Sequence, residues 1–214
     1  MLENILNFKM DQGKYIEDIK EIMDIMNRSS RFSSLSGLSG ISVGFIALIG
    51  VYIAYQTVYL NQDYFRYEKT IIPAESLVTL LLIGLFTIIL SIVTVIYFTT
   101  REAEKRNENI WDQSAKKLVI NLLIPLVTGG ILCLILLFKG YIGIIAPLTL
   151  IFYGLALINA SKFTLSEIHS LGMIQIALGL VGAHFIGFGL IFWGVGFGIL
   201  HIIYGIMMYL RYRS

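Results

Sequence analysis

Six long runs without any Asp, Glu, Lys or Arg place the strongest constraint on how this chain can fold. They extend over about Gly37–Leu60, Leu77–Thr99, Leu118–Phe138, Tyr141–Ala160, Ser170–Phe188 and Leu190–Leu210. A membrane-crossing helix needs about 20 apolar residues, so each run can form one. Of the 214 residues, 57% are apolar and 14% are charged, whereas soluble domains have about 45–50% and about 25%. The sequence therefore predicts an all-α polytopic protein with six transmembrane helices in residues 35–214 and the lipid bilayer as its surroundings.

Two short breaks separate runs that would otherwise be continuous. Lys139 and Gly140 lie between the third and fourth runs. The last two runs form a stretch too long for one crossing, and it contains the sequence Gly187-Phe188-Gly189, which suits a tight hairpin.

The positions of the sixteen Lys and Arg residues predict the orientation, because basic residues stay on the cytoplasmic side during insertion. With the amino terminus inside, thirteen are cytoplasmic: five before the first run, five between the second and third runs, and Lys162, Arg211 and Arg213. The three that remain outside are Arg66, Lys69 and Lys139. We therefore expect both termini in the cytoplasm and an even number of spans.

Residues 1–34 form a more polar segment ahead of the first run. Between residues 11 and 27, apolar side chains recur at helical spacing with charged ones between them, which predicts a cytoplasmic amphipathic helix. Its polar face is not rich in Lys or Arg, so an anionic lipid surface is not the favoured target. The helix either docks on the bundle itself or contacts a cytoplasmic protein partner or a second copy of the chain.

Glycines recur at helical spacing in the first and last runs. They are Gly40 and Gly44 in the first run and Gly194, Gly198 and Gly205 in the last. Small residues at such spacing let helix backbones approach closely in lipid. At 100° per residue, His201 falls on the same face as the glycines of the last run. The pattern predicts a helix-packing face with an imidazole at its middle.

Three polar side chains inside the runs form a candidate intramembrane site: His201, Gln175 and Asn121. An unpaired polar group is costly in lipid, so such residues face protein or a water-filled cavity. Pro125 has no N–H to donate to the carbonyl of Asn121, four residues earlier. We therefore expect the third helix to bend and to expose this backbone oxygen. These side chains either line a polar path or only bond neighbouring helices.

The sequence indicates no catalytic, cofactor or metal site. It contains no phosphate-binding glycine loop and no nucleophile elbow. The absence of carboxylates within the six runs argues against a cation pump. His169 opens the fifth span at the inner face, His184 lies near its outer end and His201 is central in the last run, so the three histidines are too far apart to share one ion. Glu167 fits a capping box that begins at Thr164, which gives it a structural role.

The charge balance and the single cysteine bear on two further features, a nucleic-acid partner and a disulfide. A formal charge of +2 is far from the basic balance of a nucleic-acid binder, so we expect no nucleic-acid partner. Cys133 is the only cysteine, so an intrachain disulfide is impossible, and the sequence gives this residue no role.

Three strings resemble a family of uncharacterised bacterial integral membrane proteins. They are SLSGLSG at Ser34–Gly40, IWDQSAKKLVINLLIPLVTGG at Ile110–Gly130 and GFGILHIIYG at Gly196–Gly205. The resemblance implies a multi-span helical fold in the bacterial cytoplasmic membrane and brings no established activity. From the sequence we expect a non-enzymatic sensor, regulator or assembly partner. The alternative is a small transporter or channel with a polar path near His201, Gln175 and Asn121.

Overall fold

A computed structural model of the chain describes residues 36–59, 74–105 and 111–211, and within these ranges it contains helices and no strands. Six helical segments are long and apolar enough to cross a membrane: Gly37–Thr57, Glu75–Lys105, Gln113–Phe138, Ile142–Phe163, Ser166–His184 and Ile186–Arg211. The predicted six-span, all-α fold is therefore confirmed. The amphipathic helix predicted at residues 11–27 lies outside the described residues.

The first three spans are long helices. The first consists of α2 (Gly37–Ala54) and the short π-helical section η1 (Tyr55–Tyr59), the second is α3 (Ala74–Lys105) and the third is α4 (Gln113–Phe138). The carboxylate of Asp112 accepts a hydrogen bond from the backbone N–H of Ala115 at 2.6 Å and so caps the start of α4. Gly140 follows α4 with a φ of +84°, a conformation that favours glycine. The break predicted at Lys139 and Gly140 is thus the turn of a helical hairpin.

The last three spans contain shorter helical pieces. The fourth span is η2 (Ile142–Ile144), α5 (Ile145–Ala160) and η3 (Ser161–Phe163), and the fifth is α6 (Ser166–His184). The sixth is η4 (Ile186–Phe188), α7 (Gly189–Trp193), the π-helical section η5 (Gly194–Leu200) and α8 (His201–Arg211). The chain reverses direction between α6 and α7, where the hairpin was predicted.

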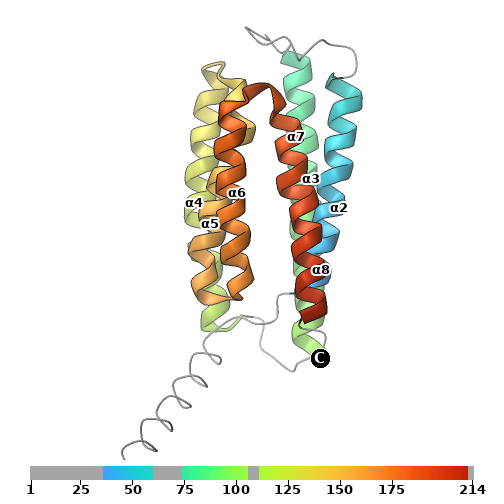
Figure 1. The fold of residues 1–214 in the computed structure, drawn as a ribbon, viewed down its shortest axis with the longest axis vertical. Helices are drawn as coiled ribbons and strands as arrows, with labels where there is room; N and C mark the ends of the chain where they lie inside the picture. The colour runs from blue at the N-terminus through green and yellow to red at the C-terminus, as the bar shows by residue number, and fades with distance from the viewer. Residues whose placement is uncertain (1–35, 60–73, 106–110, 212–214) are drawn as a thin grey trace, which may run out of the picture.

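The six spans form two groups, which Figure 1 shows side by side. We call spans one, two and six, with α2, α3 and α8, the first unit, and spans three, four and five, with α4, α5 and α6, the second unit. In the first unit, α2 packs against both α3 and α8, and in the second unit, α5 packs against both α4 and α6. Helices α3 and α4 follow one another in the chain but lie on opposite sides of the structure (Figure 1). Sequence order and spatial order therefore differ.

The second unit is held by a close approach of the α5 and α6 backbones. A Cβ atom added to Gly154 would lie 2.6 Å from the carbonyl oxygen of Gly172, and one added to Gly172 would lie 2.7 Å from that of Gly154. Such distances leave room for glycine alone, as expected where small residues let helices meet in lipid.

The sixth span joins the two units. Its first helix, α7, packs against α5 and α6, whereas its last helix, α8, packs against α2. The section η5 lies between them and contacts both α2 and α6. We call the end of the bundle where α8 finishes the Arg211 end; α3 also finishes there, and α4 and α6 begin there.

Candidate functional site

A polar cluster lies where η5 meets α5 and α6. The carbonyl oxygen of Gly196 accepts a hydrogen bond from Nε2 of Gln175 at 2.7 Å and lies 2.9 Å from Nδ1 of His201. Gln175 comes from the middle of α6, and His201 is the first residue of α8. The structure therefore brings together two of the three predicted site residues, through a backbone atom of a π-helical section. Such sections are frequent at functional sites.

The hydrogen bonds of His201 fix the position of its proton. A carbonyl oxygen only accepts, so Nδ1 must carry the hydrogen that it shares with Gly196. In a neutral imidazole Nε2 is then an acceptor, and it lies 2.8 Å from the hydroxyl of Tyr153 on α5. We infer that Tyr153 donates to His201. A proton added to this ring would go to Nε2 and would turn the Tyr153 hydroxyl into an acceptor.

Aromatic rings surround the imidazole. The Phe197 ring is stacked with it at a centroid distance of 6.0 Å, and the Tyr153 ring lies 5.5 Å away. Trp193 extends this group, since its ring centroid lies 4.7 Å from that of Phe197. His201 is only 6% exposed as a result. The cluster is a closed, largely apolar environment with a few fixed polar atoms.

One polar atom of the cluster has no partner among the residues that the structure describes. Gln175 is completely buried, and none of these residues donates a hydrogen bond to its Oε1. The amide cannot turn over without losing the bond from Nε2 to Gly196, so Oε1 stays unpaired. An unpaired buried acceptor costs about 1–3 kcal/mol. A Cβ atom added to Gly196 would lie only 2.7 Å from this oxygen, so the cluster depends on a glycine here.

Asn121, the third predicted site residue, belongs to a different polar contact. Its side chain donates to the carbonyl of Lys117 in its own helix at 2.8 Å. Its backbone carbonyl accepts a hydrogen bond from Nδ2 of Asn159 on α5 at 2.9 Å. This is the carbonyl that was expected to be exposed because Pro125 has no N–H. The structure instead satisfies it from the neighbouring helix, and α4 continues through the proline.

The glycines predicted for helix packing lie between α2 and the sixth span. A Cβ atom on Gly40 would lie 3.0 Å from the Cα of Gly205, and one on Gly44 would lie 2.6 Å from the carbonyl oxygen of Gly198. A Cβ atom on Gly194 would lie 3.5 Å from a side chain of α2. Gly40 and Gly44 thus place the backbone of α2 in direct contact with that of the sixth span, whereas Gly194 contacts a side chain.

His201 does not share the side of the helix that the glycines occupy, which differs from the prediction. The glycines face α2, whereas the imidazole reaches Tyr153 on α5. The reason is the π-helical section between Gly194 and Leu200. Its wider turns do not keep the 100° per residue on which the prediction depended.

An ion pair at the Arg211 end was missed by the sequence analysis. Nη1 of Arg211 lies 2.7 Å from Oε1 of Glu167, whose side chain is 5% exposed. Helix α6 begins at Ser166 with Leu165 at its N-cap position, so Glu167 lies in the first turn and faces α8. The signal was present in the sequence, because both residues fall at the same end of two consecutive antiparallel runs.

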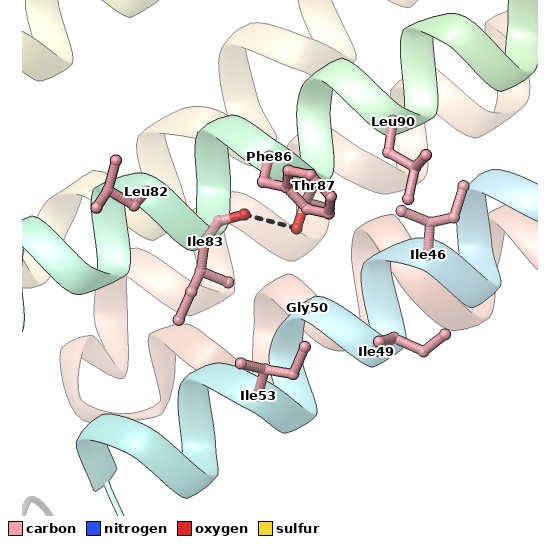
Figure 2. Close-up of a pocket in the computed structure, with 9 residues that line it drawn as sticks. All are labelled: Ile46, Ile49, Gly50, Ile53, Leu82, Ile83, Phe86, Thr87 and Leu90. Carbon is pink, nitrogen blue, oxygen red and sulfur yellow. Dashed lines mark hydrogen bonds between the residues drawn. The ribbon is translucent and has the colours of Figure 1, made fainter.

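An apolar groove lies between α2 and α3 in the first unit. Figure 2 shows its lining side chains, among them Ile46 and Ile53 of α2 and Phe86 and Leu90 of α3. The groove encloses about 310 Å³. Its one hydroxyl, that of Thr87, donates to the carbonyl of Ile83 in its own helix at 2.8 Å. The groove therefore suits hydrocarbon groups and lies apart from the polar cluster.

Among the residues that the structure describes, no group of three or more His, Cys, Asp and Glu side chains is placed to hold a metal ion. Comparison of the chain with protein-family models, curated proteins and solved structures finds no match. The resemblance to a bacterial membrane protein family therefore stays a prediction.

Proposed function

We propose that this chain is a non-enzymatic membrane protein that works as a sensor, regulator or assembly partner. The observation that supports this function is the closed state of the polar cluster. Gln175 and His201 both bond Gly196, and His201 also bonds Tyr153. A transport path would offer hydrogen-bond donors to a solute, and a catalytic site would offer them to a substrate. Here these donors bond other groups of the protein instead.

Exposed apolar surface on the outer helices agrees with a role in assembly. In the most apolar stretch of α3 only 6% of the residues are buried within the chain, and in that of α4 only 11%. Phe86, at 68% exposed, is one of many large apolar side chains on these surfaces. Such surfaces meet lipid or the helices of a partner.

The proposed partner contact is the amphipathic segment at residues 11–27, in the cytoplasm of a bacterial cell. Of the seven Lys and Arg residues that the structure describes, six lie at the Arg211 end: Arg101, Lys105, Lys116, Lys117, Lys162 and Arg211. Lys139 lies at the opposite end. This distribution supports an orientation with the Arg211 end inside.

A small transporter or channel is the alternative, and the unpaired Oε1 of Gln175 is the observation that favours it. A buried acceptor without a partner can accept a hydrogen bond from a solute that crosses the protein. In this alternative the path runs past Gln175 and His201, and Asn121 lies apart from it on the far side of α5.

Two measurements on the full chain separate these functions. In the first, membranes from expressing cells are treated with a cross-linker, and the products of the natural chain are compared with those of a variant whose residues 11–27 are replaced by a Gly/Ser segment of equal length. We expect one defined product, either a second copy or one other protein, that the replacement removes. If the same products form with both chains, the proposed partner contact is wrong.

The second measurement tests for transport. Purified protein is placed in liposomes that contain a pH-sensitive dye, and proton leak and potassium leak are followed. We expect the leak to match that of empty liposomes. A leak that His201→Leu abolishes without unfolding the protein would replace the proposed function with the transporter alternative.

A further inference from the structure

The sixth span changes its packing partners halfway along its length. Before η5, a Cβ atom on Gly182 of α6 would lie 3.3 Å from the ring of Phe192 in α7, so α7 is seated on the second unit. After η5, a Cβ atom on Gly205 of α8 would lie 2.5 Å from the backbone nitrogen of Ile41 in α2. Helix α8 therefore belongs to the first unit, and η5 is the connection between the two.

The glycines of η5 alternate between the two units. Gly194 and Gly198 lie against Val51 and Leu48 of α2, whereas Gly196 lies against Leu150 of α5 and Gln175 of α6. Three glycines in a section of seven residues give this backbone unusual freedom, because glycine lacks the Cβ that restricts φ and ψ. A movement between the units would be absorbed here, since the helices on either side are held by their own unit.

Side-chain hydrogen bonds hold this section in place. Gln175 of the second unit bonds the carbonyl of Gly196, and Tyr153 of the second unit bonds His201 at the start of α8. We call these two contacts the latch. The ion pair between Arg211 and Glu167 is a further link between the units, at the far end of α8.

We propose that η5 is a hinge about which the first unit pivots against the second, and that the latch holds the hinge closed. Hinges consist of a few residues that absorb a change in φ and ψ between bodies that move as units. The closed state keeps Oε1 of Gln175 unpaired, and opening of the hinge gives this oxygen access to a donor. The proposal applies equally to a protein that works by assembly and to one that transports a solute.

Distances between spin labels on the two units test the hinge. Ile96 on α3 and Leu123 on α4 are 60% and 47% exposed, and they lie on helices of different units. In a chain with Cys133→Ala, labels are attached at cysteines introduced at these two positions, and the distance distribution is measured by pulsed electron paramagnetic resonance in nanodiscs. The latch is then removed with Gln175→Leu, with His201→Phe and with both.

The matched control is Asn159→Leu. It removes an equivalent hydrogen bond from a side-chain amide to a backbone carbonyl, but this bond joins α4 to α5 within the second unit. We expect a narrow distribution in the parent chain and in the control, and a broadened or second peak in the latch variants. A latch variant that stays folded and keeps the parent distribution would overturn the proposal.

A measurement on the unaltered chain decides the matter if the latch variants do not fold. Hydrogen–deuterium exchange reports how often a backbone amide opens. The hinge predicts that amides in η5 exchange at least ten times faster than those around Tyr153 in α5, whose side chain contacts His201 directly after η5. Equal protection of the two segments would show that η5 does not move and would also overturn the proposal.

Discussion

The contact between α2 and α8 predicts a large loss of stability from a single methyl group. In Gly205→Ala, the new Cβ would lie 2.5 Å from the backbone nitrogen of Ile41 and 2.8 Å from the carbonyl oxygen of Gly37. Ordinary contacts of a Cβ atom begin at 3.4 Å, so the shortfall at Ile41 is 0.9 Å. Backbone atoms cannot turn aside as a side chain can. The two helices must therefore separate by nearly that distance.

The expected magnitude follows from this geometry. Overpacking costs about 1–3 kcal/mol, and the upper end applies where backbone meets backbone. For a chain of this size, 1 kcal/mol changes the melting temperature by about 2–4 °C. We therefore expect Gly205→Ala to melt about 6–12 °C below the natural protein. The measurement is thermal unfolding in detergent micelles, followed by circular dichroism.

The matched control is Gly130→Ala on the exposed side of α4. A Cβ atom there would meet nothing within 4 Å, and the substitution has the same intrinsic effect on the helix. We expect no loss, or a gain of up to about 1 kcal/mol, because alanine restricts the unfolded chain more than glycine does. If the two variants melt at the same temperature, the backbones of α2 and α8 are not in contact at Gly205 and the reasoning is refuted.

Two further contacts give predictions that the same unfolding measurement checks. Asn159→Leu should cost about 1–2 kcal/mol, because the Asn121 carbonyl loses its donor. The loss of stability caused by Asn159→Leu should be smaller in a Pro125→Ala background, because the alanine N–H can donate to the Asn121 carbonyl. An equal loss in both backgrounds would refute this explanation. Arg211→Met should destabilise more than Glu167→Gln, because it leaves a carboxylate that is 5% exposed without its guanidinium. Equal effects of these two substitutions would show that the buried charge does not matter.

The six spans and their hairpins were predictable because each depends on local sequence alone. Runs of about 20 uncharged residues define the helices, and Gly140 marks a turn through its own backbone conformation. The pairing of the helices was not predictable in the same way. Spacing shows that Gly40 and Gly205 lie on faces made of small residues, but it does not show that these faces meet each other.

Of two polar contacts between helices, one could have been predicted from the sequence and the other could not. Asn121 lies 17 residues before the end of α4, and Asn159 lies 17 residues after the start of η2. A hairpin places such residues at equal depth, so the partner of the carbonyl freed by Pro125 was recoverable. The hydrogen bond between His201 and Tyr153 could not be predicted in this way, because it depends on a π-helical section that no local residue pattern indicates.

The arrangement of the two units has a consequence for how the protein is made. Spans three, four and five are consecutive and complete the second unit among themselves, so they can assemble as they leave the ribosome. The first unit combines spans one, two and six, so the face of α2 that bears Gly40 and Gly44 stays uncovered until the sixth span has been synthesised, although α3 can already pack against α2. During translation this face of α2 is therefore covered only at the end, and until then it is open to capture by a chaperone or a neighbouring membrane protein.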